Sequence, residues 1–195
     1  MSVIAELYAA LAGAREKKVR LVAAATMAEQ VVWSVCHPVD TLSGVASIVD
    51  EFLLPLVTAM PDLERKPFIH ISGEYEGENW VAGTGYFVGT FSSPLFDIPP
   101  TGKTLYLRYS ELVRMDNGRI AQCYLFPDFL DAMQQAGVYP LRPGLGHPGL
   151  MMPPSTLDGI CGIDRNPQYS ADTVQLIMDM LDCLRKYDGD RLESM

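Results

Sequence analysis

The sequence predicts an α+β fold in which N-terminal helices cover one face of an antiparallel sheet. Before Met60, apolar residues recur at helical spacing, as at Ile4, Leu7 and Leu11. From Pro67 the pattern changes to extended segments that alternate apolar and polar residues between short turns. Helices followed by consecutive strands are typical of the α+β class, because strands joined by short turns run antiparallel.

The composition is that of a globular protein with a net acidic charge. Hydrophobic residues make up 48% and charged residues 20% of the 195 residues, and the formal net charge is -9. Nucleic acids and anionic membranes attract basic surfaces, so this charge argues against both as main partners. Glu6 interrupts the N-terminal apolar stretch and no apolar run approaches ~20 residues, so neither a signal peptide nor a membrane span is expected.

The cysteines and histidines show no metal-binding pattern. The cysteines are widely spaced without a Cys-x-x-Cys pair, which predicts reduced thiols in a cytoplasmic protein. The histidines have no ligand spacing among themselves or with the cysteines, and no Gly-x-Gly-x-x-Gly fingerprint is present, so neither a metal nor another cofactor is expected. These residues are Cys36, Cys123, Cys161, Cys183, His37, His70 and His147.

Three helices are expected in the N-terminal part. The first covers Ile4 to Leu11 and ends near Gly13, and residues 17–30 are rich in alanine and also predicted to be helical. Residues 31–35 read as a strand. A third helix carries an apolar stripe over residues 45–57, and Pro55 either kinks it or starts its last turn.

Four strands follow, as two hairpins. Residues 68–76 and 79–91 flank a turn at Glu76-Gly77-Glu78. Residues 105–115 and 119–126 flank a turn at Asp116-Asn117-Gly118.

The C-terminal third divides into three parts. A short helix is expected at 128–135, and it closes a first domain of residues 1–143. Residues 144–169 form a linker rich in proline and glycine. Residues 170–195 carry a last helix, with Asp172 and Gln175 spaced like a capping box, and an acidic tail.

One stretch imitates a nucleotide-binding loop. FDIPPTGKT, residues 96–104, ends like a phosphate-binding P-loop. Asp97 occupies the position of the first glycine, and Pro99 and Pro100 remove backbone N–H donors. A strand follows Thr104 where a P-loop requires a helix, so a nucleotide site is excluded.

Five motifs in this order resemble SnoaL-like polyketide cyclases of the nuclear-transport-factor/ketosteroid-isomerase superfamily. They are His37-Pro38-x-x-x-Leu42-x-Gly44, Met60-Pro61-Asp62-Leu63, Gly85-Tyr86-Phe87-Val88-Gly89, Ile98-Pro99-Pro100-Thr101-Gly102-Lys103 and Asp128-x-x-x-x-Met133-x-Gln135-x-Gly137. The resemblance covers residues 28–143 and implies a cystatin-like fold. In it a strongly curved antiparallel sheet is wrapped by helices into a cone around an apolar pocket. It also implies a homodimer that pairs through the outer sheet face.

The tail resembles the opening helix of another domain of the same superfamily. This similarity covers residues 170–195. It leaves two interpretations open: a shortened tandem protein, or a helix recruited to cover the pocket or the dimer face.

Glu111 is the first catalytic candidate. It lies on the otherwise apolar face of the strand 105–115, where burial raises the pKa of a carboxyl toward the range that general acid/base chemistry needs. The alternative is that Glu111 pairs with an arginine across the sheet.

The resemblance places the cyclase acid/base aspartate at Leu125 and the neighbouring family histidine at Glu111. Leu125 cannot transfer a proton, so either Glu111 has taken over the role or the activity has changed. Asp128 matches a frequent family carboxylate, yet capping of the helix that it precedes also explains it.

The ligand expected in such a pocket is a small apolar or aromatic compound, such as a polyketide-like carbonyl compound. Aromatic side chains with a polar tip suit a ligand of this kind. Candidate lining residues are Trp33, His37, Tyr86, Tyr109, Tyr124 and Leu125, although strand parity places Tyr124 opposite Leu125. The sequence therefore predicts either cofactor-free proton transfer of the cyclase or isomerase type, or a non-catalytic binding or interaction module of the same fold.

Overall fold

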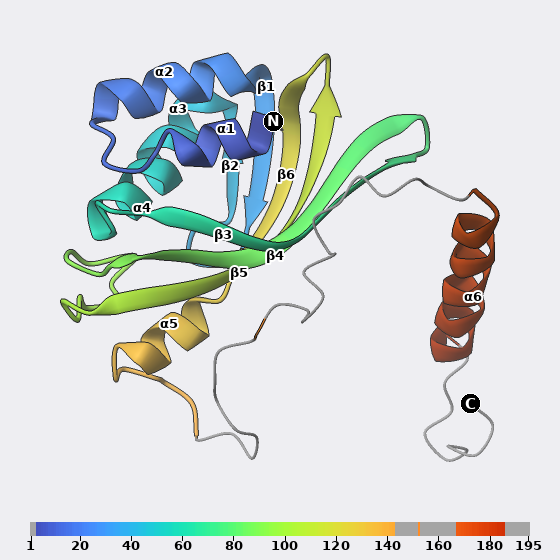
Figure 1. The fold of residues 1–195 in the computed structure, drawn as a ribbon. Helices are drawn as coiled ribbons and strands as arrows, with labels where there is room; N and C mark the ends of the chain where they lie inside the picture. Colours follow the sequence, from blue (N-terminus) through green and yellow to red (C-terminus); the bar gives the residue numbers. More distant parts are fainter. Residues whose placement is uncertain (1–2, 143–151, 153–166, 186–195) are drawn as a thin grey trace. The chain divides into compact units, whose positions relative to one another are not determined.

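A curved, six-stranded sheet with helices on its concave side forms the main body of the protein (Figure 1). The computed structural model describes residues 3–142, 152 and 167–185. The strands lie in the order β2-β1-β6-β5-β4-β3, and the sheet does not close into a barrel. The α+β class with a curved sheet, predicted from the sequence, is confirmed.

The helices before the first long strand pair pack against the concave side of the sheet. They are α1 (Val3–Ala9), α2 (Glu16–Thr26), α3 (Gly44–Ile48), the π-helical segment η1 (Val49–Leu53) and α4 (Leu54–Ala59). Pro55 starts α4 directly after the π-helical turn, which confirms one of its two predicted roles. The helix predicted over residues 17–30 ends at Thr26 instead, because Met27 already pairs with Ile120 in the sheet.

The five strands expected from the sequence are present, together with one that was not expected. Their bounds are β1 (Met27–Val35), β2 (Thr41–Ser43), β3 (Glu64–Tyr75), β4 (Glu78–Thr90), β5 (Thr104–Asp116) and β6 (Arg119–Pro127). The short strand β2 was not predicted. The sheet is also not purely antiparallel, because β1 runs parallel to β6. Asn117 and Gly118 have positive φ angles of 46° and 75°, as the tight turn between β5 and β6 requires.

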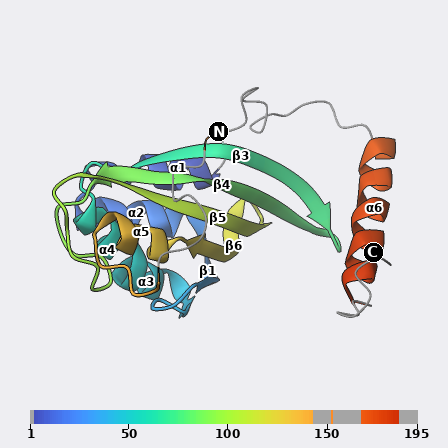
Figure 2. The same ribbon diagram turned by 90° about the horizontal axis from the view of Figure 1, so that it is seen from below.

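Strand β3 begins at Glu64, before the predicted start at residue 68, and so includes Pro67. It forms an edge of the sheet, so a proline that cannot donate a hydrogen bond is tolerated there. The register between β3 and β4 shifts between Pro67 and Ile69. Gly85 lies opposite Pro67, and a Cβ at Gly85 would overlap the Lys66 carbonyl oxygen and lie 2.8 Å from Cα of Pro67. The two strands curve together from this region, as Figure 2 shows.

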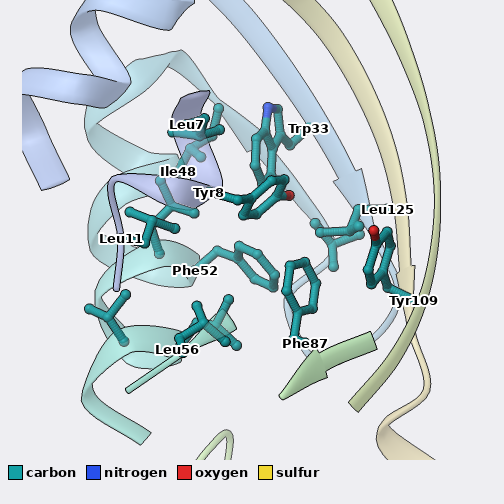
Figure 3. Packing of buried hydrophobic residues seen from close by; sticks show 14 of the residues in the cluster. Leu7, Tyr8, Leu11, Trp33, Ile48, Phe52, Leu56, Phe87, Tyr109 and Leu125 are labelled. Carbon is teal, nitrogen blue, oxygen red and sulfur yellow. The ribbon is translucent and has the colours of Figure 1, made fainter. Parts of the chain in front are cut away.

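The hydrophobic core lies between the helices and the inner face of the sheet. Figure 3 shows Trp33, Phe52, Phe87 and Leu125 facing one another there, and each is almost completely buried. Tyr8 of α1 packs on Phe87, with 5.1 Å between the ring centroids. Inner-face residues of β1, β4, β5 and β6 therefore share one core with the N-terminal helices.

Two helices follow the sheet. Helix α5 (Phe129–Gln135) has Asp128 as its N-cap, as predicted. Helix α6 (Pro167–Arg185) belongs to a second unit, Gly162–Met195, separate from the unit Met1–Cys161. Because α6 starts at Pro167, Asp172 lies inside it and accepts a hydrogen bond from Gln168, so the predicted capping box is wrong.

Some sequence predictions lie outside the described residues. These are His147, Cys161, the acidic tail after Arg185 and most of the linker 144–169. Among the described helices, none is both long and apolar enough to cross a membrane.

We expect Gly85→Ala to destabilise the protein by about 1–3 kcal/mol, because the added methyl group overlaps the backbone of β3. Urea unfolding measures the change in the free energy of unfolding. Gly73→Ala is the matched control in the same hairpin, since no atom lies within 4 Å of a Cβ at Gly73, and it should change stability by less than about 0.5 kcal/mol. Equal effects of the two substitutions would contradict the close packing assigned to Gly85.

Candidate functional site

A row of inner-face residues crosses the sheet at Glu111. In β4 the residue opposite Glu111 is Gly83, and in β6 it is Leu125. His70 of β3 lies opposite Gly83 on its other side. The row therefore places a carboxyl and an imidazole on the same face of the sheet, with a glycine between them.

Glu111 forms a buried ion pair with Arg65 of β3. Nη2 of Arg65 donates a hydrogen bond to Oε1 of Glu111, and the two side chains are 6% and 0% exposed. A Cβ at Gly83 would lie 3.0 Å from Oε1 of Glu111 and 3.4 Å from Nη2 of Arg65. The glycine thus leaves room for the arginine to reach across β4, and the pairing of Glu111 with an arginine, the alternative from the sequence, is present.

Two tyrosine rings enclose the guanidinium of Arg65. Its central carbon lies 5.1 Å from the ring centroids of both Tyr8 and Tyr109. Contacts of this kind stabilise a cation that has lost its water. Figure 3 shows both tyrosines in the core between α1 and β5.

Several polar atoms of this cluster lack a partner. Among the described residues, Nε of Arg65, Oε2 of Glu111 and the hydroxyl of Tyr109 are buried without a hydrogen bond. Nε1 of Trp33 is in the same situation. Since buried polar groups are nearly always hydrogen-bonded, so many unpaired atoms on one face of the sheet mark it as a candidate site for a polar ligand group.

Burial raises the pKa of Glu111 above its usual value, and the positive charge and hydrogen bond of Arg65 oppose this effect only in part. The direction agrees with the sequence prediction. Burial also raises the pKa of the Tyr109 hydroxyl, which therefore remains protonated at neutral pH. The pKa of His70 is lowered by burial and by the nearby charge of Arg65, so its imidazole is neutral at neutral pH.

A pocket of about 380 Å³ lies between α1 and β3. Tyr8 and Arg65 are the members of the cluster that line it, whereas Glu111 and Tyr109 lie behind Arg65 and are not part of the lining. Its lining is Ala5, Tyr8, Ala9, Ala12, Leu63, Glu64, Arg65 and Pro67. The volume falls within the range of small-molecule sites.

Comparison with known proteins identifies the family. The profile of the SnoaL-like polyketide cyclases matches residues 3–136, which is more than half of the chain. The chain belongs to the SnoaL-like polyketide cyclase family. No curated protein matches the sequence of this SnoaL-like protein.

Solved structures share the fold at low sequence identity. A protein of Jannaschia sp. CCS1 assigned as a SnoaL-like polyketide cyclase has a TM-score of 0.54 and 20% identity, over 71% of this chain and 91% of that one. IdmH of Streptomyces antibioticus, assigned as a polyketide cyclase, has a TM-score of 0.55 and 19% identity, over 70% and 96%. A Catenulispora acidiphila protein with a ketosteroid isomerase-like fold has a TM-score of 0.52 and 12% identity, over 70% and 92%.

The two positions taken from the family resemblance face each other in this SnoaL-like protein. Leu125, where the resemblance places the cyclase aspartate, is fully buried and directly opposite Glu111. Trp33 and Tyr109 are also buried on this inner face. The structure thus brings together Glu111, Leu125, Trp33 and Tyr109 of the predicted site residues.

The other predicted residues lie elsewhere. Tyr86 packs against Tyr106, and Tyr124 stacks on Trp80, both on the outer face of the sheet, because strand parity turns them away from Glu111. The His37 side chain is 85% exposed and lies 3.5 Å from Asp40.

Asp128 has the structural role that its position suggests. Its Oδ1 accepts the backbone N–H of Asp131 at 3.0 Å, and its Oδ2 accepts a hydrogen bond from Arg108 at 2.5 Å. Arg108 lies on the opposite face of β5 from Glu111, so these contacts hold Asp128 away from the inner cluster.

Sequence reasoning missed Arg65, Tyr8 and His70 as members of the site. Tyr8 lies in the first predicted helix and His70 in a predicted strand, and neither was singled out as a site residue. Arg65 lay outside the predicted strand, which began at residue 68. The useful signal was position: extending β3 through Pro67 places Arg65 and His70 on the inner face, on either side of the register shift. Within the described residues, no group of three His, Cys, Asp or Glu side chains could hold a metal ion.

The raised pKa of Glu111 predicts a particular pH dependence of stability. The unfolded chain ionises first, near pH 4.5, so the contribution of Glu111 falls as the pH rises from there through the folded pKa. We expect the free energy of unfolding of the wild type, minus that of Glu111→Gln, to decrease between pH ~4 and ~8 in urea titrations. An increase would mean that the attraction of Arg65 outweighs burial and that the pKa of Glu111 is lowered.

Proposed function

We propose that this SnoaL-like protein binds an apolar cyclic or polyketide-like carbonyl compound and catalyses proton transfer on it without a cofactor. Glu111 carries this proposal: it is a fully buried carboxyl with a raised pKa and one oxygen without a partner among the described residues. A general base needs a pKa near the working pH and a position from which it reaches the substrate.

The proposed step uses groups already in the cluster. Oε2 of Glu111 accepts the proton from a carbon next to the substrate carbonyl, the C–H electron pair forms the enolate, and negative charge develops on the carbonyl oxygen. The protonated hydroxyl of Tyr109 and the guanidinium of Arg65 are donors that stabilise such an oxygen. Return of the proton from Glu111 to another carbon completes an isomerisation. In a ring closure the enolate carbon instead attacks a second carbonyl, and the proton held by Glu111 passes to the alkoxide that forms there, which restores the carboxylate.

A second function, non-catalytic binding, is favoured by Leu125. The family acid/base position holds a side chain that cannot exchange a proton, and the base that remains is paired with Arg65, whose charge reduces its basicity. The same fold hosts both roles. On this alternative the pocket binds its ligand and leaves it unchanged.

We further propose that two copies associate through the outer sheet face, in the cytoplasm. Among the described residues, Ile71, Tyr106, Leu112 and Phe126 of that face are apolar and have 36% or more of their surface exposed. Exposed apolar side chains on one sheet face can be covered by a second copy. The unpaired cysteines Cys36, Cys123 and Cys183 are consistent with a reducing compartment.

Glu111→Gln should reduce catalysed proton exchange by about 10²–10⁴-fold, because it removes the base and keeps the shape of the side chain. The measurement is proton NMR of 2-tetralone and related aromatic ketones in deuterated buffer, where exchange next to the carbonyl removes a resonance. Glu78→Gln, at an exposed residue paired with Arg114, is the matched control and should retain the wild-type rate. A folded Glu111→Gln protein with the wild-type rate would exclude Glu111 as the base. Ketones that bind without exchange above the buffer rate would instead support the non-catalytic alternative.

Phe126→Glu should convert the dimer to a monomer in light scattering, because it places a charge in the proposed apolar interface. Leu21→Glu on α2, where Leu21 is 62% exposed, is the matched control and should remain dimeric. A monomeric wild-type protein, or a dimeric Phe126→Glu protein, would contradict the proposed interface.

A further inference from the structure

We infer that the pocket between α1 and β3 binds a flat ligand with an acidic oxygen, a carboxylate or an enolate, which hydrogen-bonds to Arg65. This inference names the ligand class of the proposed site and rests on the proposed function. It is carried by three observations: the apolar lining of the pocket, the unsatisfied donor of Arg65 and the aromatic rings that contact its guanidinium.

The lining of the pocket is mostly small and apolar. Ala5 and Ala9 of α1 and Ala12 of the following turn contribute only methyl groups to it. Leu63 and Pro67 add apolar surface to the lining. An apolar lining of this kind favours the face of a ring system over a flexible polar ligand.

Arg65 is the one cation in this lining. The other charged residue of the lining, Glu64, is 60% exposed and forms an ion pair with Lys66, so it lies toward solvent. Arg65 is almost completely buried, and within the described part of the chain its Nε has no hydrogen-bond partner. A buried guanidinium with a free donor favours an acidic oxygen over a neutral carbonyl, because charge-assisted hydrogen bonds are about twice as strong as neutral ones.

Tyr8 links the pocket to the catalytic cluster. Its ring lines the pocket and also contacts the Arg65 guanidinium, as does the ring of Tyr109. The planar guanidinium presents its N–H donors along its edge, which is where a ligand anion would bind. The same edge bonds Glu111, so Glu111 and the ligand compete for the charge of Arg65.

The test compares two bicyclic probes of nearly the same shape, 2-naphthoate and its neutral analogue 2-acetylnaphthalene, by isothermal titration calorimetry on the full chain. We expect the wild type to bind the carboxylate about tenfold or more tightly than the ketone, which corresponds to one charge-assisted hydrogen bond. Equal affinity for the two probes, or tighter binding of the ketone, would overturn the inference.

Ala9→Trp locates the binding site without disturbing the core, since Ala9 is exposed and lines the pocket. It should weaken binding of 2-naphthoate about tenfold or more, whereas the matched control Leu21→Trp on α2 should leave it unchanged. Unchanged affinity of the folded Ala9→Trp protein would place the ligand elsewhere and overturn the inference.

Glu111→Gln separates this inference from the proposed function. The variant loses the competing carboxylate, so it should bind 2-naphthoate more tightly than the wild type and 2-acetylnaphthalene with similar affinity. If the protein binds the ligand but does not catalyse proton transfer, Glu111→Gln should still bind 2-naphthoate more tightly, and the wild type should show no exchange of 2-tetralone. Weaker binding of 2-naphthoate by folded Glu111→Gln would contradict the assignment of Arg65 as the anion-binding group.

Discussion

The buried ion pair between Arg65 and Glu111 constrains the whole inner face of this SnoaL-like protein. Two charges removed from water cost several kcal/mol each unless they meet with good geometry, so the surrounding residues must hold them together. Gly83 provides the space between them, and the rings of Tyr8 and Tyr109 cover the guanidinium. Arg65 comes from the edge strand β3, where it lies opposite the buried Phe87 just before the register shift between Pro67 and Ile69.

The proposed function depends on the same pair for both binding and proton transfer. Burial raises the pKa of Glu111, and the positive charge of Arg65 lowers it in part. A ligand anion that bound Arg65 would weaken this second effect and so raise the pKa of Glu111 further. Directly opposite Glu111, the apolar Leu125 occupies the position at which the family resemblance places an aspartate. The chemistry is therefore concentrated on the β3 side of the sheet, where the pocket opens beside α1.

Local patterns in the sequence were sufficient to predict most of the helices and strands, and strand alternation placed Glu111 on the inner face. The same patterns could not predict that Glu111 pairs with Arg65, because this contact spans 46 residues and depends on the register of three strands. Pro67 made the start of β3 hard to predict, because proline is tolerated in a strand mainly at the edge of a sheet. That β3 is an edge strand follows from the order of the strands, which the local sequence does not show. Parity also explains why Tyr86 and Tyr124 lie outside the inner cluster.

The most direct test of the central role of this pair is a double-mutant cycle in urea unfolding with Arg65→Met, Glu111→Leu and the double variant. If the pair is buried as described, each single substitution leaves one uncompensated charge and should cost about 3–5 kcal/mol, whereas the double variant should be close to the wild type in stability. Additive losses in the double variant would show that the two residues do not depend on each other and would contradict the structure of the site proposed for this protein.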